Sequence, residues 1–355
     1  MTKEQIFLLD YLGEQKYAAI QGAAGTGKTV IALEAAKRLA DNGRRVLFLC
    51  FNELLCEHFR RDCEHERVDY FNINAFVASL TKGLDIMDVK KRVQALYNID
   101  PDRLNYDDII IDEAQDLQDS EIDYFRDFCN QKKGTFFLFY DKNQIILGRQ
   151  IPTWITTSEC RLLLKRNCRN TVAIAKTSAN VIDAPFVQLP NLIPGSQPSI
   201  VFMKEDPKIE LSRILKTFMS EKNDYKPNEI TILSLRSQEK SFLNGVNSLF
   251  GVPISTKGDG ASVFFTTAKR FKGLESKVVV IIDIDEDDFI DDQNQRTFYV
   301  ACSRAMQKLC LMMPGDPESL KKIAVATKSF GLTDEAKILG KTLTKRVDSK
   351  TVQPL

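Results

Sequence analysis

The chain lacks several features that would assign it to a class at once. Its 355 residues carry a formal net charge of +1, so a nucleic acid surface would have to be a local basic groove. No apolar run reaches the ~18 residues needed to cross a bilayer. The charged opening segment does not resemble a signal peptide, and there are no fixed-period repeats or low-complexity tracts. We therefore expect a soluble, cytoplasmic globular protein with no membrane partner.

Cysteine is present without a disulfide or metal pattern. The eight cysteines are scattered through a chain too long to need disulfide bonds for stability. One metal-like pattern is the repeated Cys-Glu-His at 56–58 and 63–65. On a helix the two copies would lie roughly 10 Å apart, whereas one zinc needs ligands within ~2.3 Å. We interpret the repeat as solvated thiols on a polar helix face.

The order of apolar segments predicts two tandem α/β domains. Short apolar runs typical of strands buried on both faces alternate with amphipathic segments, which favours mostly parallel sheets flanked by helices. The runs are 17–22, 45–51, 68–73, 108–114 and 135–141, then 199–203, 229–235, 262–267, 277–284 and 308–313. We expect domains over 1–160 and 161–330 and a polar tail over 331–355.

A phosphate-binding loop lies between the first apolar run and the helix after it. GAAGTGKT, residues 22–29, matches the pattern G-x-x-x-x-G-K-[ST]. The glycines let backbone N–H groups face phosphates, and the helix presents its positive end to the same anion. Lys28 would reach the β- and γ-phosphates, and Thr29 would hold Mg²⁺. The residues expected to bind the nucleotide here are Gly22, Gly25, Thr26, Gly27, Lys28 and Thr29.

Two adjacent acids end a later apolar run, in IIIDEAQD (109–116). Asp112 would take the metal side of a P-loop enzyme. Glu113 is placed to orient and deprotonate a water, so the expected reaction is hydrolysis of Mg·ATP to ADP and phosphate. A solvated strand end is the alternative, and the P-loop upstream favours the catalytic interpretation.

Further motifs, taken in order, resemble the UvrD/Rep-like superfamily 1 helicases. DEAQD resembles motif II of that family, and the chain segments similar to its other motifs are LCFNELL (49–55, motif Ia), YDKNQ (140–144, motif III), LKRNCRN (164–170, motif IV), TAKRFKGLE (267–275, motif V) and YVACSRA (299–305, motif VI). The resemblance spans roughly residues 3–310. It implies two RecA-like domains, with ATP and Mg²⁺ in an interdomain cleft and single-stranded nucleic acid across both.

The resemblance also implies roles for single residues. Gln5, in a KEQ segment similar to the Q motif, would read the adenine edge, and Glu275 would bind the ribose. Gln144 would couple the γ-phosphate to the nucleic acid groove, and Arg169 would contact a phosphate. Arg304 would be an arginine finger of the second domain, worth ~10³ to 10⁵ in rate. Without the other motifs, Arg304 would be interpreted as a stem packed along a helix.

The chain departs from the family pattern at four points. Cys168 replaces the motif IV tyrosine that stacks on adenine, which weakens the expected selectivity for ATP. Lys269 replaces the motif V histidine, in a basic stretch that could track a phosphate backbone or form a solvated face. Motif III continues into aliphatic residues instead of base-stacking aromatics, and Trp154 is more readily a core residue. The segments 52–111 and 170–266 barely complete two α/β cores, without the family's large insertions.

Two functions stay open on the sequence. The first is an ATP-dependent motor on single-stranded nucleic acid, DNA more readily than RNA. The second is an ATP-gated nucleic-acid sensor that signals to a partner protein such as a nuclease, which the short insertions favour. A small-molecule kinase fits poorly, because motifs V and VI have no role there and Glu113 implies water as the acceptor.

Overall fold

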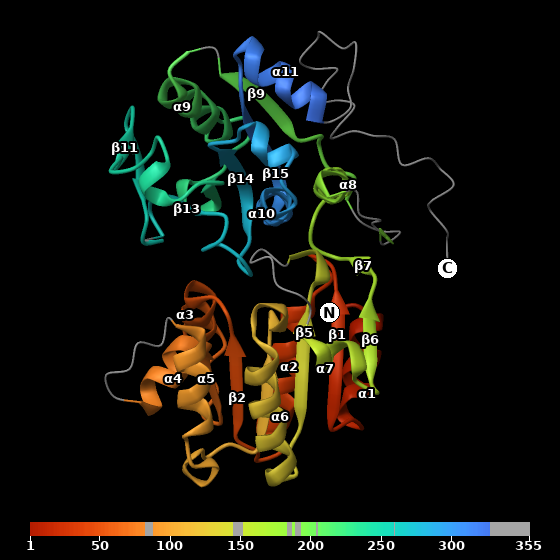
Figure 1. Ribbon diagram of the computed structural model, residues 1–355. Coiled ribbons are helices and arrows are strands. Elements are labelled where there is room, and N and C mark those ends of the chain that lie inside the picture. The colour runs from red at the N-terminus through yellow and green to blue at the C-terminus, as the bar shows by residue number, and fades with distance from the viewer. Residues whose placement is uncertain are drawn as a thin grey trace. The chain divides into compact units, whose positions relative to one another are not determined.

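The computed structural model describes residues 1–81, 88–144, 152–182, 187–188, 193–203, 205–258 and 260–326. The chain divides into two compact units, Met1–Lys165 and Arg166–Leu355 (Figure 1). The expected tail over 331–355 lies outside the described residues. In the part of the chain that the structure describes, no helix has the length and apolar character needed to span a membrane.

The first unit is built on a six-stranded parallel sheet in the order β3-β2-β4-β5-β1-β6. All five apolar runs predicted in this half form strands. The strands are β1 (Tyr17–Gly22), β2 (Val46–Cys50), β3 (Val68–Asn72), β4 (Asp108–Ile111), β5 (Phe136–Tyr140) and the edge strand β6 (Arg161–Leu164), which the sequence did not predict. The helices are α1 (Lys3–Gly13), α2 (Lys28–Asp41), α3 (Glu53–Asp62), α4 (Ile73–Leu80), α5 (Val89–Tyr97), α6 (Asp119–Lys132) and α7 (Thr153–Thr157), with 3₁₀ turns η1 (Pro101–Arg103), η2 (Ala114–Asp116) and η3 (Lys142–Gln144).

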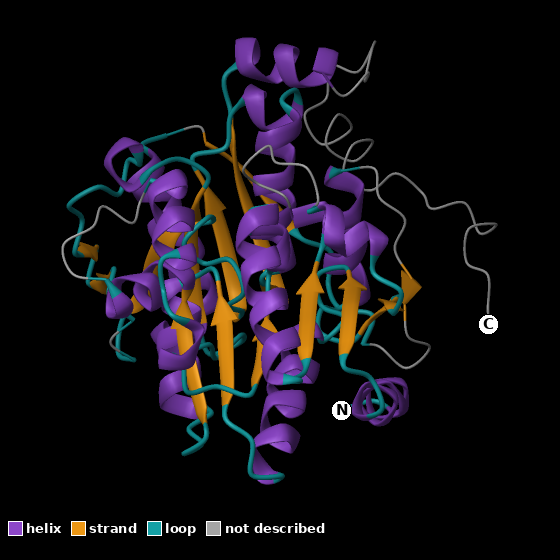
Figure 2. Cartoon of the chain, turned by 60° about the horizontal axis from the view of Figure 1, so that its bottom comes forward, coloured by secondary structure: helices purple, strands orange, loops and turns teal. Residues whose placement is uncertain are grey.

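Helices cover both faces of this sheet, as continuous apolar strands require (Figure 2). Apolar side chains of α4, α5 and α6 pack on one face against Leu47, Ile109 and Leu138. On the other face Phe48 packs against Phe59 of α3, with ring centroids 5.5 Å apart. Because all six strands are parallel, their carboxyl ends lie along one edge of the sheet, where ligands bind in open α/β folds.

The second unit contains a seven-stranded, mostly parallel sheet in the order β11-β12-β13-β10-β14-β15-β9. Only the β11–β12 pair is antiparallel among the described pairings of this sheet. The strands are β9 (Ser199–Met203), β10 (Ile230–Ser234), β11 (Ser248–Leu249), β12 (Val252–Ser255), β13 (Val263–Thr267), β14 (Ser276–Ile282) and β15 (Ala305–Pro314), with a separate pair β7 (Arg166–Asn167) and β8 (Val187–Gln188). The helices are α8 (Val172–Val181), α9 (Pro207–Phe218), α10 (Asp292–Ser303) and α11 (Pro317–Ala326), with 3₁₀ turns η4 (Pro227–Glu229), η5 (Gln238–Lys240) and η6 (Glu286–Phe289).

The predicted fold class is confirmed by these two sheets. Both are parallel or mostly parallel and flanked by helices, as predicted for two tandem α/β domains. The five apolar runs predicted in the second half form β9, β10, β13, β14 and β15. The antiparallel β11–β12 hairpin was not predicted, since its strands are only two and four residues long.

One interpretation of the cysteines was wrong. Cys56 is a buried residue of α3, with its Sγ 3.2 Å from Sγ of Cys50, so it is not a solvated thiol. The helix ends at Asp62, which leaves Cys63 as its C-cap. Within the described ranges, no group of three or more His, Cys, Asp or Glu residues could hold a metal ion.

Trp154 packs on the core, its ring 5.3 Å from that of Phe136.

Candidate active site

The glycine-rich loop joins β1 to α2 at the carboxyl edge of the first sheet. Gly25 and Gly27 have φ angles of 77° and 85°, which favour glycine. Gly22 lies so close to Thr26 that an added Cβ would be 2.4 Å from Thr26 Oγ1. The Thr26 hydroxyl donates to the carbonyl of Ala23 at 2.8 Å. The loop therefore curls around its own backbone at the start of α2, the geometry that suits an anion.

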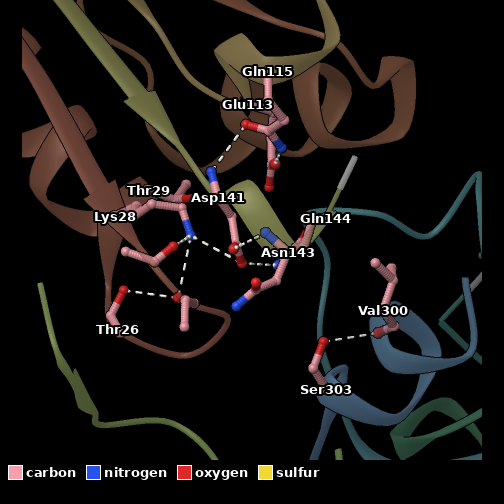
Figure 3. A network of polar contacts seen from close by, with 12 residues as sticks. Thr26, Lys28, Thr29, Glu113, Gln115, Asp141, Asn143, Gln144, Val300 and Ser303 are labelled. Atoms are coloured by element: carbon pink, nitrogen blue, oxygen red, sulfur yellow. Dashed lines mark hydrogen bonds and ion pairs between the residues drawn. The ribbon is translucent and has the colours of Figure 1, made fainter. Parts of the chain in front are cut away.

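Lys28, the first residue of α2, is buried with its amino group inside the loop. Its Nζ donates to the carbonyls of Gly22 and Ala23 at 2.7 and 3.2 Å. A carboxylate oxygen of Asp141 lies 3.8 Å from the same nitrogen (Figure 3). Asp141 follows β5 directly, so two neighbouring strand ends meet at this lysine. In each of these three contacts the partner of the Lys28 ammonium is an oxygen atom, and together they hold the ammonium at the centre of the loop.

The Thr29 hydroxyl meets the first acid after β4. Its Oγ1 donates to Asp112 Oδ2 at 2.6 Å. Burial raises the pKa of Asp112 to about 6, and the charge of Glu113 raises it as well, whereas the Thr29 hydrogen bond and Lys28 act in the opposite direction. A buried carboxylate with this environment favours a cation beside it. A hydroxyl and a carboxylate oxygen are the hard ligands that Mg²⁺ takes.

Glu113 adopts a backbone conformation that is uncommon for glutamate. Its φ is 56° and its ψ is 39°, in the left-handed region, and the residue is buried. Such strain costs about 1–3 kcal/mol and is concentrated at functional sites. Its backbone N–H donates to Asp112 Oδ1 at 3.0 Å, and one carboxylate oxygen accepts from Gln115 Nε2. The two acids therefore turn their carboxylates to different neighbours.

Gln144 lies on η3, the short turn after β5. Its Nε2 donates to Asp141 Oδ2 at 2.8 Å, and the residue is buried. Burial raises the pKa of Asp141, and the charge of Lys28 lowers it. Asp141 is therefore shared by the loop lysine and Gln144. The sequence singled out Gln144 and missed Asp141, although a polar residue directly after an apolar run was visible.

Gln5 reaches the phosphate loop from α1. Its Nε2 donates to the carbonyl of Thr26 at 3.1 Å, while its Oε1 accepts from the backbone N–H of Thr2 at 2.8 Å. A Cβ added to Gly27 would lie 2.2 Å from Gln5 Nε2. The amide thus packs directly on the loop and caps its own helix. The first unit therefore brings together all of the predicted site residues that it contains: Gln5, Gly22, Gly25, Thr26, Gly27, Lys28, Thr29, Asp112, Glu113 and Gln144.

The second unit contains the remaining three predicted residues. Arg169 Nε lies 2.5 Å from Glu275 Oε2, so the residues that resemble motifs IV and V form an ion pair. The neighbouring Asn170 is buried and donates to the carbonyls of Ser303 and Ala305 at 2.9 and 2.6 Å. Those two carbonyls flank Arg304. Asn170 therefore holds the segments that resemble motifs IV and VI together, and the sequence did not single it out.

Arg304 follows α10 directly and is 1% exposed. Its guanidinium donates to the carbonyl of Val300 at 3.1 Å, to the carbonyl of Leu274 at 3.4 Å and to Ser303 Oγ at 3.2 Å. All three partners belong to the second unit. In this structure the guanidinium is packed and hydrogen-bonded within its own unit, as a helix-stem interpretation predicts.

The basic stretch in the segment that resembles motif V is only partly at the surface. Lys269 and Arg270 are exposed, whereas Lys272 is buried. Cys168, at the position of the family's adenine-stacking tyrosine, is half-buried, and its Sγ lies 3.4 Å from the carbonyl oxygen of Arg166. Of the three basic residues, Lys269 and Arg270 are therefore the two that a phosphate-contacting surface could use.

Two helicase family models match the chain. The Schlafen group 3, DNA/RNA helicase domain matches residues 15–175, and the UvrD-like helicase C-terminal domain matches residues 262–312. By these two matches the chain is similar to superfamily 1 helicases. The first of these helicase matches includes the phosphate loop and the acid pair, and the second includes Glu275 and Arg304.

Solved helicase structures resemble this helicase-like chain at low identity. The structure of PRRSV helicase covers 87% of this chain with a TM-score of 0.46 and 11% identity, and the match covers 54% of that chain. The Pif1 helicase from Candida albicans covers 89% with a TM-score of 0.48 and 13% identity, and the match covers 94% of that chain. The chain thus spans about half the length of the PRRSV helicase. No curated protein matches the chain.

Proposed function

We propose that this protein is an ATP-dependent nucleic-acid motor of the superfamily 1 helicase type. It hydrolyses Mg·ATP and couples the reaction to binding and translocation on a single strand, DNA more readily than RNA. The observation that carries the proposal is the hydrogen bond from Thr29 to Asp112 beside the buried Lys28. That arrangement lies within a chain whose two halves each match a helicase family model.

The loop residues fit a triphosphate. The present contacts of Lys28 Nζ are weaker than hydrogen bonds to a phosphate would be, because carbonyl oxygens are neutral and the Asp141 carboxylate is 3.8 Å away. Charge-assisted hydrogen bonds to phosphate are roughly twice as strong as neutral ones. We therefore expect Lys28 to turn from Gly22 and Ala23 to the β- and γ-phosphates, while Gly25 and Gly27 offer backbone N–H groups.

Thr29 and Asp112 would hold Mg²⁺, since a hydroxyl and a carboxylate already converge there. The ion supplies charge neutralisation between the β- and γ-phosphates when bound. Glu113 would orient the attacking water and accept its proton, because its carboxylate is separate from that of Asp112 and is held by Gln115. Gln144 would respond to the γ-phosphate through Asp141, whose carboxylate accepts a hydrogen bond from the Gln144 amide.

The second unit would supply the remaining groups. Arg169 and Glu275 form an ion pair with one another, and we propose that nucleotide competes for both, phosphate for the arginine and ribose for the glutamate. Arg304 would act as the arginine finger, which requires its guanidinium to exchange the carbonyls of Val300 and Leu274 for the γ-phosphate. Asn170, which binds the carbonyls on either side of Arg304, would keep the finger's backbone in place.

The proposal is tested by ATPase rates against a panel of single-stranded and duplex DNA and RNA. We expect turnover to rise severalfold or more with a single strand and little with blunt duplex. Lys28→Ala should abolish turnover, whereas Glu113→Gln should still bind nucleotide and keep a residual rate about 10²- to 10⁴-fold below that of the wild type, the usual contribution of a general base. A rate that no single strand changes, in a protein that binds Mg·ATP, would count decisively against a motor.

A second candidate is an ATP-gated nucleic-acid sensor that signals to a partner protein such as a nuclease. The observation in its favour is the compact build of both units. Between β3 and β4 the described residues form only α4, α5 and η1, and between β10 and β13 only η5 and the β11–β12 hairpin. A strand-displacement assay on forked and tailed duplexes separates the two candidates, because a sensor would hydrolyse ATP on a single strand without displacing the complement.

A further inference from the structure

We propose that Gln115 is a positioning residue for ATP hydrolysis, which fixes the Glu113 carboxylate and ties it to Asp141. The proposal rests on the proposed function, in which Glu113 orients the attacking water. Neither the phosphate-loop pattern nor the acid pair predicts a role for Gln115 or Asp141. Their relationship exists only in the folded unit, where the turn after β4 meets the end of β5.

Gln115 makes one hydrogen bond on each side of its amide. Its Oε1 accepts from the backbone N–H of Asp141 at 3.0 Å, and its Nε2 donates to Glu113 Oε2 (Figure 3). The residue is 0% exposed and lies on η2. Because the amide is buried, water does not compete for either hydrogen bond, and a hydrogen bond to a charged carboxylate is stronger than one between neutral groups.

The two partners fix which way the amide points. A backbone N–H can only donate and an ionised carboxylate can only accept, so a flipped amide would lose both hydrogen bonds. Glutamate could keep the contact to Asp141 but would set a second carboxylate against Glu113. Methionine has a similar length but makes neither hydrogen bond. Of these side chains, only the amide serves both partners, so the chemistry at position 115 is directional.

Glu113 has a specific need for such a partner. Its backbone is in the left-handed region at φ 56°, directly after β4, and its own N–H is taken by Asp112. The side chain leaves this strained backbone beside a second acid, whose charge would push the two carboxylates apart. A buried donor on Glu113 Oε2 offsets that repulsion and selects one direction for the carboxylate. We infer that Gln115 sets the angle at which Glu113 meets a water.

Asp141 links this contact to the phosphate site. Its backbone N–H holds Gln115, while its carboxylate lies 3.8 Å from Lys28 Nζ and accepts from Gln144 Nε2 at 2.8 Å and from the Asn143 N–H at 2.9 Å. When Lys28 turns to a phosphate, the Asp141 carboxylate loses its cation but keeps the hydrogen bonds from Gln144 and Asn143, so the position of Asp141 can change together with that turn. Gln115 would pass such a shift from Asp141 to Glu113, so the base is set when the triphosphate is in place.

The test measures single-turnover ATP hydrolysis and nucleotide affinity for Gln115→Met and Gln115→Glu. We expect the rate at saturating ATP to fall about 10- to 100-fold, because a misplacement of about 1 Å can cost 10²-fold. The Kd for Mg·ADP should stay within about twofold of the wild-type value, since neither partner of Gln115 binds phosphate directly. Gln94→Met is the matched control, because Gln94 is exposed on α5 and should keep the wild-type rate.

A double mutant separates positioning from a loss of structure. In a Glu113→Gln background the substitution Gln115→Met should add almost nothing, because the group on which Gln115 acts is already disabled. An equal loss in both backgrounds, or a matching rise in the Kd for Mg·ADP, would refute the proposal. Should Gln115→Met prove unstable on heating, Gln115→Glu carries the test, since it keeps the acceptor for Asp141 N–H.

Failure of the inference and failure of the proposed function give different results. If the wild type hydrolyses ATP and Gln115→Met does so equally fast, the inference is wrong while the motor proposal stands. If the wild type binds Mg·ATP but hydrolyses none with any single strand, the proposed function fails and the inference fails with it. A reduced rate at unchanged affinity, absent in the Glu113→Gln background, supports both.

Discussion

The hydroxyl of Thr29 and the carboxylate of Asp112 are 2.6 Å apart, although the residues are 83 positions apart in the chain. Thr29 lies on α2, which follows β1, and Asp112 follows β4 directly. These two strands are not neighbours in the sheet, because β5 lies between them. The contact arises because α2 begins at the carboxyl edge where β4 ends. The two oxygen atoms that we propose as Mg²⁺ ligands thus lie together in the folded unit, and the contribution of each can be measured.

Thr29→Val should raise the Mg²⁺ concentration needed for half-maximal ATPase activity by about 10-fold or more, as is typical when a ligand contact is lost. Valine has nearly the same shape as threonine but offers no oxygen to the metal. Titrating the ATPase rate with Mg²⁺ at fixed ATP gives this value. Thr29→Ser is the control, because it keeps the hydroxyl and should titrate like the wild type. An unchanged Mg²⁺ requirement in Thr29→Val would remove Thr29 from the metal site.

Arg304→Ala should lower single-turnover hydrolysis by about 10³-fold or more while sparing the affinity for nucleotide. The guanidinium is packed against carbonyls of Val300 and Leu274, so the variant should also lose stability, by about 1–3 kcal/mol per carbonyl left without a donor. Arg236→Ala is a matched control, because Arg236 pairs with Asp285 and Asp288 in the same unit and lies outside the helicase motifs. It should lower stability and leave hydrolysis intact. Normal hydrolysis by Arg304→Ala would assign the residue to packing alone.

The strands with continuous apolar runs were predictable, because a strand buried on both faces needs apolar residues at successive positions. The edge strand β6 was not, since its apolar run is only three leucines, 162–164, between Arg161 and Lys165, and the strand is largely exposed. The roles of Gln115 and Asn170 could not be predicted from the sequence for a different reason. Asn170 binds carbonyls 133 and 135 positions away, and a backbone carbonyl has no residue type to recognise. The motifs indicated candidate reacting groups, whereas the groups that hold those candidates in place depend on the fold.

Glu121→Gln should destabilise the first unit by about 3–5 kcal/mol, the usual cost of breaking a buried ion pair from one side. Arg92 Nε and Glu121 Oε1 are 2.6 Å apart and both side chains are buried, joining α5 to α6. Lys132→Met is the comparison, because its partner Asp102 is exposed and such a pair contributes under about 1 kcal/mol. Urea unfolding of the three proteins gives the difference. Equal losses in the free energy of unfolding of the two variants would show that burial of the ion pair does not increase its contribution to stability.

Tyr124→Phe should stabilise the protein by about 1 kcal/mol near neutral pH, since it removes a buried hydroxyl that finds no hydrogen-bond partner among the described residues. Burial raises the pKa of Tyr124 to about 12, above the value of 10.0 for a free phenol. The unfolded chain therefore loses this proton first, and wild-type stability should fall as pH rises from about 10 towards 12. Phenylalanine has no such proton, so the advantage of the variant should grow over that window. Urea unfolding at pH 8 and pH 11 measures it. At pH 8, Tyr97→Phe is the control for removal of a hydroxyl, because the Tyr97 hydroxyl donates to Ser120 O at 3.2 Å and its loss should not stabilise the protein. A constant difference across the two pH values would mean that the Tyr124 phenol ionises as readily in the folded protein as in the unfolded chain.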